Sequence, residues 1–520
     1  MADGRQHYDC IVVGGGHNGL VCASYLARSG RSVLVLEAAD QAGGAATTRE
    51  FAPGFWVSAC AHLLHLMPAE MMQELGLASH GLALAAQHLA TVALSTEGKH
   101  LTLGATGLGG EMSAADVTAY AEWQRLRGRL AAALHPALLE PPPRLGTGAW
   151  GDRAALLRLG WRIRRLGRRD MRELLRIGGM CAHDLLAERF ESPLLSGALA
   201  LDAVLGTNLG PRSPGTVFSL LYRAAAPGGD ENLAVPRGGL GALTEALRRA
   251  ALAAGADLRT RTPVARIVVR EDRACGVMLS SGEALTARTV ISSADPKTTF
   301  LDLLGSEHLD AGFVRRLGQL RSRGLAAKVH LALDRLPQFP GLDSAALRSR
   351  LLVAPSPEYV ERAFNHAKYA EYSAAPVLEV TVPTLADDTL APPGRHVMSI
   401  IAQYAPYEIA AGWPEERERF KELVIRTLAA YAPELPACVS AVELLLPGDI
   451  EREFRIVGGH WHHAELALDQ FFLVRPVAGA AQYRTPLPGL YLCGAGCHPG
   501  GGVMGLAGRN AARRVLAEAA

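Results

Sequence analysis

A chain of 520 residues is too long for one ordinary core, so we expect two or three domains that pack closely together. The formal net charge is only +2, which argues against nucleic acid as a partner, and 49% of the residues are hydrophobic. No uncharged apolar run reaches about 18 residues, so no membrane-spanning helix is expected. The polar start of the chain does not resemble a secretory signal, and scattered cysteines without a CxxC pair favour reduced thiols, so we expect a cytoplasmic protein.

The first twenty residues open like a nucleotide-binding unit. The apolar run Cys10 to Val13 predicts a strand that is covered on both faces. A GxGxxG motif follows directly at Gly14, Gly16 and Gly19. In such motifs the first glycine turns the chain, the second lets a pyrophosphate approach, and the third lets a helix pack on the strand.

The next residues complete a βαβ unit. A helix is predicted over residues 20–27, with Gly30 at its C-terminal end, and Ser32 to Leu36 predict a second strand. Glu37 stands at the end of that strand, where a carboxylate can accept both hydrogens of a ribose diol. Strand, helix, second strand and terminal acid therefore occur in the order that dinucleotide binding requires.

Two further glycine-rich stretches favour FAD over NAD. Gly43 and Gly44 follow Glu37, where flavin domains often place a turn beside the extended cofactor. Near the other end of the chain, a strand from Leu490 to Cys493 leads through glycines into a helix that we expect to begin near Gly502 to Met504. Free N–H groups at such a helix start can face the pyrimidine edge of a flavin.

Several segments resemble the phytoene-desaturase-like flavoproteins, most closely the group called pyridine nucleotide-disulfide oxidoreductase domain-containing protein 2. They include "VVGGGHNGL", "LEAADQAGGAATT", "PGFWVSACAHLLHLM", "VPRGGLGALTEAL" and "YRTPLPGLYLCGAGCHPGGGVMGLAGRNAA". The resemblance implies non-covalent FAD, an α/β FAD-binding domain of the glutathione-reductase and amine-oxidase kind, and an inserted α+β substrate domain. The cofactor contacts expected are Gly14, Gly16, His17, Asn18, Gly19, Glu37, Ala38, Gly43, Gly44, Ala45, Val264, Gly494, Ala495, Gly502, Val503 and Met504.

The sequence departs from the wider superfamily at three points. The CxxxxC pair of disulfide reductases is absent, and Gln41, Ala42 and Ala45 occupy the region where amine oxidases carry an arginine. Ala495 stands where many flavoproteins carry an acid after the terminal "CG". We therefore expect backbone and helix ends to carry most of the binding of the FAD phosphates and ribityl chain.

The middle of the chain contains a second cofactor segment. A helix from Ala242 to about Ala253, a strand Asp257 to Arg261, a hairpin spanning 264–279 and a strand Thr289 to Ser292 are predicted there. By the resemblance, the backbone at Val264 flanks the adenine. The expected division is an FAD-binding domain formed by 1–67, 233–299 and 464–520, a mostly helical insertion 68–232, and a substrate domain 300–463 with strands at 328–333, 377–382 and 396–403.

Two stretches between these segments have a distinctive composition. Glu140 to Gly148 reads as an exposed linker. Residues 153–176 hold nine arginines among apolar positions that include Trp161, interrupted by Gly160 and Gly167. A basic amphipathic helix of this kind suits peripheral contact with an anionic membrane, although a solvated face or an oligomer contact explains the same pattern.

Few ionisable residues are expected beside the flavin. His62, His463 and His498 are candidates for a general acid or base, and packing or a structural hydrogen bond is the alternative for each. Arg475 is a candidate for binding a substrate carboxylate or holding the charge of reduced flavin, with a salt bridge to Asp469 as the alternative. No histidine or cysteine spacing predicts a metal site.

The sequence therefore predicts an FAD-dependent oxidoreductase. The favoured reaction is desaturation, by hydride transfer between flavin N5 and a small apolar substrate that carries an alkene or a ring. A flavin-dependent cis–trans isomerase or saturase, an amine oxidase, and a flavin-stabilised binding or escort protein are the alternatives. The electron acceptor, oxygen or a quinone, and the oligomeric state stay open.

Overall fold

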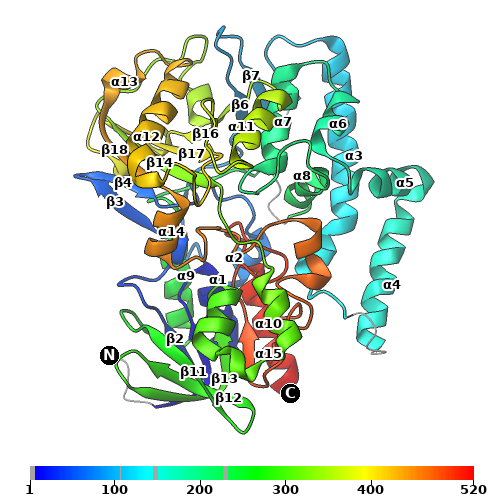
Figure 1. Cartoon of the computed structure of the whole chain (residues 1–520), viewed down its shortest axis with the longest axis vertical. Coiled ribbons are helices and arrows are strands. Elements are labelled where there is room, and N and C mark those ends of the chain that lie inside the picture. Colours follow the sequence, from blue (N-terminus) through cyan, green and yellow to red (C-terminus); the bar gives the residue numbers. More distant parts are fainter. Residues whose placement is uncertain (1–5, 106, 145–149, 227–231, 520) are drawn as a thin grey trace.

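A computed structural model describes residues 6–105, 107–144, 150–226 and 232–519. Two lobes are stacked along the long axis of the molecule, and each is built around one mixed β-sheet with helices packed on it (Figure 1). The predicted α/β class with a nucleotide-binding sheet and a second sheet-and-helix part is confirmed.

The first lobe contains a seven-stranded sheet whose core is parallel. Its strand order is β10-β2-β1-β13-β12-β11, and β19 pairs with β13 outside this path. Strands β10, β2, β1, β13 and β19 all run parallel to their neighbours, so their carboxyl ends meet at one edge. The strands are β1 (His7–Val13), β2 (Val33–Leu36), β10 (Asp257–Arg259), β11 (Val264–Arg270), β12 (Arg273–Leu279), β13 (Ala284–Ser292) and β19 (Leu490–Leu492).

Helix α1 (His17–Arg28) packs against both α9 (Leu240–Ala253) and α15 (Leu506–Ala519) beside this sheet. The contact with α15 requires glycine, because a Cβ on Gly508 would lie 2.1 Å from the backbone oxygen of Asn18. Segments from the two ends and the middle of the chain thus form one nucleotide-binding lobe.

The second lobe contains an eight-stranded sheet in the order β18-β14-β17-β16-β15-β6-β7-β8. The strands predicted at 328–333, 377–382 and 396–403 correspond to β14 (Ala326–Leu333), β16 (Val377–Thr381) and β17 (His396–Gln403). Three strands come from the segment expected to be mostly helical. The remaining strands are β6 (Thr91–Ala93), β7 (Leu101–Gly104), β8 (Gly107–Gly109), β15 (Arg350–Val353) and β18 (Val439–Leu445).

Helices and small hairpins surround the two sheets. The short hairpin strands are β3 (Thr48–Ala52), β4 (Phe55–Ser58), β5 (Leu84–Ala86) and β9 (Val235–Pro236). The helices are α2 (Ala69–Glu74), α3 (Ala114–Leu139), α4 (Trp150–Arg165), α5 (Gly167–Ile177), α6 (Ala182–Ala187), α7 (Pro193–Val204), α8 (Thr216–Ala225), α10 (Ala311–Gly318), α11 (Pro357–Ala367), α12 (Trp413–Ala429), α13 (Leu435–Cys438) and α14 (Pro447–Phe454).

The arginine-rich stretch forms two helices, α4 and α5, which extend away from the body of the protein (Figure 1). Gly167 separates them with a left-handed φ of 81°, whereas Gly160 continues α4 without a break. No helix in the described ranges combines the length and hydropathy needed to cross a membrane.

The predicted linker at 140–148 lies partly outside the described residues. In its described part, Pro142 and Pro143 are buried, and the side-chain amide of Gln482 donates a hydrogen bond to the Pro142 carbonyl. The prediction of an exposed linker is therefore wrong for these residues, because the prolines dock against the C-terminal segment.

Candidate functional site

A large cavity links the two lobes, and it holds about 2020 Å³ of empty space when the open solvent at its mouth is included. One half is lined by the loops at the carboxyl edge of the parallel strands, and the other half by α7, α8 and the second sheet. Most of the predicted cofactor contacts line it. They are Gly14, Gly16, His17, Asn18, Glu37, Ala38, Gly43, Gly44, Ala45, Val264, Ala495, Gly502 and Val503.

The glycine turns present bare backbone to this cavity. A Cβ on Gly16 would meet nothing within 4 Å, so the position faces open space where a pyrophosphate can approach. Gly43 donates its N–H to the Gly15 carbonyl at 2.9 Å, and Gly44 lies against Gly16. The two glycine pairs expected to flank the cofactor are therefore adjacent, with the start of α1 beside them.

Glu37 lies at the end of β2 and lines the cavity. Its Oε2 accepts the Gly15 N–H at 2.7 Å, and its Oε1 accepts the Ala39 N–H at 2.8 Å. Each carboxylate oxygen keeps acceptor capacity after these bonds, because an ionised carboxylate has about four lone-pair sites. The backbone thus fixes the group that we expect to hold the ribose.

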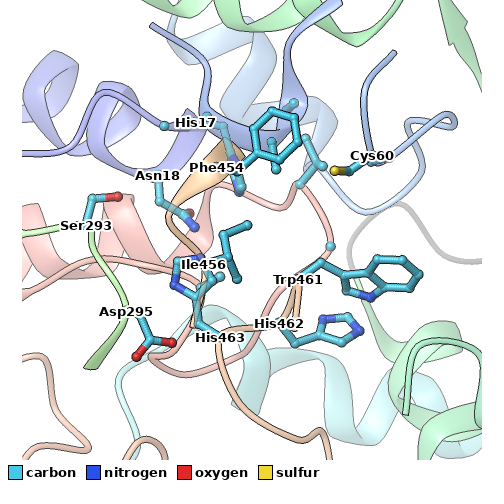
Figure 2. Close-up of a pocket in the computed structure, with 18 of the residues that line it drawn as sticks. His17, Asn18, Cys60, Ser293, Asp295, Phe454, Ile456, Trp461, His462 and His463 are labelled. Atoms are coloured by element: carbon cyan, nitrogen blue, oxygen red, sulfur yellow. The ribbon is translucent and has the colours of Figure 1, made fainter. Parts of the chain in front are cut away.

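Eight buried polar side-chain atoms of residues that line the cavity have no hydrogen-bond partner in the described ranges. They are His17 Nε2, Asn18 Oδ1, His65 Nδ1, Ser219 Oγ, Arg223 Nε, Asp295 Oδ2, His462 Nδ1 and His463 Nδ1. Buried polar atoms normally have partners, so a gathering of orphans around one cavity points to a polar ligand. Figure 2 shows Asp295 and His463 near one another, with Trp461 and His462 beside each other farther along the wall. The residues therefore fit a cofactor with hydroxyl groups, phosphates and a flat ring system.

The C-terminal loop differs from the prediction. Helix α15 begins at Leu506, not near Gly502 to Met504. Gly502, Val503 and Gly505 have φ angles of 115°, 54° and 72°, which no right-handed helix contains. Gly502 and Val503 still line the cavity, whereas the Met504 side chain packs into an apolar cluster with Leu506.

Two other predicted contacts do not line the cavity. Gly19 packs against the strand, since a Cβ there would lie 2.1 Å from the Gly14 carbonyl oxygen, as the third glycine of the motif requires. Gly494 approaches a neighbouring loop instead of a cofactor, because a Cβ there would lie 2.5 Å from the Ser293 backbone oxygen. These two glycines allow the close packing that shapes the binding site, but they do not line it.

Arg475 lies outside the cavity in which its predicted role would place it. Its side chain is fully buried, does not line the cavity, and donates to six backbone carbonyls, including those of His462 and Ala495. It therefore clamps the loops under the site. The alternative pairing with Asp469 is wrong, because Asp469 pairs with Arg321 at 2.7 Å.

The structure also places His498 outside the cavity. Its Nε2 donates to the Ala137 carbonyl at 2.9 Å, and its ring packs against Phe471 and Phe472. Burial lowers the pKa of this histidine to about 4, so it is neutral. It anchors the C-terminal loop to α3 and is not an acid or base at the site.

His62 does line the cavity, with both ring nitrogens engaged by protein groups. Lys328 Nζ donates to Nδ1 at 2.7 Å, and Nε2–H donates to Glu379 Oε1 at 2.8 Å. Burial, and then the charge of Lys328, lower the pKa of His62 to about 4. These bonds give His62 a positioning role in place of the predicted acid–base role. Of the three candidate histidines, His62, His463 and His498, only His463 lines the cavity with an unpartnered ring nitrogen in the described structure.

The sequence interpretation missed a charged wall made by Asp202, Arg223, Arg350 and Glu379, all of which line the substrate half of the cavity. Arg350 pairs with Asp202 at 2.7 Å and also with Glu379. Burial alone would raise the pKa of Glu379, but Arg350 and His62 outweigh it and hold the pKa well below its usual range. A signal was available, because Lys328 and Glu379 interrupt otherwise apolar strands.

Asp295 was also missed, although it closely follows β13 in "SSADP" at the carboxyl edge of the parallel sheet. Burial raises the pKa of Asp295 to about 7. Phe454, at the end of α14, completes the lining together with Ile456 and Trp461, which lie between α14 and the last cofactor segment.

A dinucleotide cradle joined by one cavity to a second, sheet-based lobe defines a flavin-dependent oxidoreductase. The chain belongs to the family described as flavin containing amine oxidoreductase, which matches residues 19–516, and FAD is its cofactor.

Individual relatives agree with this assignment. The chain is 37% identical to pyridine nucleotide-disulfide oxidoreductase domain-containing protein 2 of Mus musculus, over 99% of this chain and 94% of the relative. It is 27% identical to a lycopene-forming phytoene desaturase of Paracoccus sp., over 63% of this chain and 62% of that protein. A triple mutant of putrescine oxidase shares the fold, with a TM-score of 0.63 at 18% identity, covering 98% of this chain and 99% of that structure.

Replacing Gly16 with valine should remove FAD without unfolding the protein. The position has an extended backbone and open space around an added Cβ, so we expect the larger side chain to meet the cofactor. We expect FAD affinity to fall by about 10- to 100-fold, the range of an overpacking cost. Flavin absorbance after gel filtration measures this loss. Gly318→Val, at another open position, is the control and should keep its FAD. Full FAD content in Gly16→Val would contradict the placement of the FAD pyrophosphate beside Gly16.

Lys328 should give the protein a specific pH dependence. Burial lowers its pKa to about 7, below the value of ~10.4 for an exposed lysine. Between these values the unfolded chain binds a proton that the folded chain does not, so the free energy of unfolding rises with pH by at most about 1.4 kcal/mol per unit.

The Lys328→Met variant lacks this rise. In urea unfolding, the free energy of unfolding of the wild type relative to that of the variant should therefore increase from pH ~7 to ~10. Lys99→Met, at a largely exposed position, is the control and should give a constant difference over that range. Parallel pH curves for wild type and Lys328→Met would show that the buried lysine does not titrate as described.

Proposed function

We propose that the protein is an FAD-dependent dehydrogenase that acts on a carbon–carbon bond of a largely apolar substrate carrying an alkene or a ring. The observation that supports this most is the continuity of the cavity from the nucleotide edge into a substrate half that includes Leu63, Leu205 and Ile401. The similarity to a phytoene desaturase favours desaturation over amine oxidation.

The bound flavin supplies the redox chemistry by accepting a hydride at N5. The apolar lining orients the substrate and excludes water, while Arg475 holds the loops around it in one conformation. Loss of hydride beside an alkene makes the neighbouring C–H bond strongly acidic, so a weak base is enough to take the second proton. His463 is that base in our proposal, because it lines the cavity and its Nδ1 is unpartnered in the described structure. Burial lowers its pKa to about 3, so it is neutral and weakly basic.

The charges at the cavity make amine oxidation the weaker alternative. Both carboxylates of the substrate wall, Asp202 and Glu379, are already paired with Arg350. At this wall an incoming ammonium group would meet Arg223, with neither Asp202 nor Glu379 free to neutralise it, and burying an unpaired charge is costly. Asp295, the buried acid with an unpartnered oxygen, follows β13 on the nucleotide side of the cavity. The fold shared with putrescine oxidase does not by itself supply an amine site.

Anaerobic mixing of the FAD-loaded protein with candidate donors tests the reaction class. Partly saturated terpenoids such as citronellate should bleach the flavin band and yield the unsaturated product, whereas primary amines such as putrescine should not. His463→Gln should keep FAD and slow the bleaching by about 100-fold, the usual contribution of a proton acceptor. Bleaching by amines alone would favour amine oxidation, and no bleaching by any donor would favour a binding or escort role.

We also propose that helices α4 and α5 contact an anionic membrane surface. Trp150, Leu157 and Trp161 are 82%, 72% and 64% exposed, and no residue of α4 is buried. Their spacing of seven and four residues places them on one face of the helix. The arginines of 153–176 surround this apolar face, which is the pattern of a helix that lies in a membrane interface.

The double variant Trp150→Ser, Trp161→Ser should lose sedimentation with phosphatidylglycerol vesicles at low salt. The variant removes the two indole rings that would insert into the membrane but keeps the arginines. It therefore distinguishes insertion of the tryptophans from simple charge attraction. Trp56→Ser, at an exposed position on β4, is the matched control and should sediment like wild type. Wild-type protein that stays in the supernatant would end this proposal.

A further inference from the structure

Arg223 is the unusual member of the charged wall. It lies on α8, lines the cavity, and has a side chain only 14% exposed. In the described structure its one charged contact is from Nη2 to Asp202 Oδ1 at 3.6 Å, which is longer than a hydrogen bond. Its Nε is buried and has no partner among the described residues. A guanidinium with five donors is therefore left almost unused beside a cavity.

The neighbouring charges do not explain this arrangement. Arg350 is 2% exposed and forms a short ion pair with each carboxylate. It lies 2.7 Å from Asp202, and it also pairs with Glu379. His65 lies on the same wall and is neutral, since burial and then Arg223 lower its pKa to about 3. The wall thus contains two buried arginines and two carboxylates, so its formal charges balance, but the short contacts are concentrated on Arg350. The donors of Arg223 are left to be satisfied from the cavity side.

We infer that Arg223 binds an anionic oxygen group of the substrate, so that the substrate is an apolar, alkene- or ring-bearing carboxylate and not a plain hydrocarbon. The inference rests on the proposed function and narrows its substrate class. A carboxylate presents two coplanar acceptors, which match the fork of a guanidinium. The apolar remainder then extends along Leu205 and Ile401 in the same cavity.

This placement also fixes the orientation of the bound substrate in our inference. Arg223 lies on the helical wall opposite the glycine turns that hold the nucleotide, so the anionic end is anchored on the substrate side. A buried, charge-assisted contact of this kind discriminates strongly, because a neutral or cationic analogue leaves the arginine desolvated and unpaired.

Three probes with one hydrocarbon tail test the inference, namely geranate, methyl geranate and geranylamine. Each is titrated into the FAD-loaded protein, and binding is followed by the shift of the flavin absorption band, which needs no turnover. Wild type should bind geranate about 10- to 100-fold more tightly than the methyl ester, and should bind geranylamine most weakly. Arg223→Gln should weaken geranate by the same factor and leave the ester unchanged, while Arg223→Lys should retain part of the preference.

Arg362→Gln is the matched control, because Arg362 is exposed and its one hydrogen bond among the described residues goes from its side chain to the Glu358 carbonyl in its own helix. It should bind all three probes like wild type, and FAD content shows that each variant is folded. Equal affinity for acid and ester, no saturable geranate binding, or tightest binding of the amine would overturn the inference. A changed flavin midpoint potential in Arg223→Gln with unchanged geranate affinity would overturn it too, by assigning Arg223 to the flavin. Arg223-dependent geranate binding without any flavin reduction would instead leave the inference intact and count against the dehydrogenase.

Discussion

The whole arrangement depends on the parallel pairing of β2, β1, β13 and β19, which brings their carboxyl ends to one edge. The loops that follow these strands come from residues near 14, 37, 293 and 495, far apart in the chain. The loop near residue 14 presents bare backbone to the cavity, whereas the loop near residue 37 presents the side chain of Glu37. The close packing of α1 on α15 through Gly508 then locks the two ends of the chain together.

The second lobe solves a different physical problem. It must offer an apolar chamber to a substrate and still hold charged groups inside a sheet, where unpaired charge is costly. Lys328, His62 and Glu379 form a continuous hydrogen-bonded set, and Arg350 continues it to the helical wall. Because these groups satisfy one another, they orient the chamber without needing a ligand. Arg223 is the exception, and in our inference its unused donors give the cavity a preference for an anionic substrate group.

The nucleotide half was largely predictable, because local sequence carries its geometry. The strand ending at Val13, the glycine motif and Glu37 define a βαβ unit from spacing alone, and the cavity collects most of the residues expected there. The exact start of α15 was not predictable, since nothing in the sequence requires Val503 to adopt a φ of 54°. That angle is imposed by the surrounding packing.

The substrate half was mostly beyond sequence reasoning. His62 and Lys328 are 266 positions apart, and only the folded chain shows that they bond to each other. Arg475 and His498 were sensible candidates by residue type, yet tertiary packing turned their polar atoms towards backbone carbonyls. Three of the eight strands of that lobe were predicted from their apolar runs. The pairing across the sheet, which sets the chemistry of the wall, was not.

An experimental structure of the FAD-loaded protein is the most direct test of this account. We predict the adenosine ribose at Glu37, the pyrophosphate at the Gly16 turn, and the flavin ring between the His62 segment and the loop that carries Trp461 and His463. Density for the ring system elsewhere, or a ring cut off from the wall that carries Arg223, would contradict it.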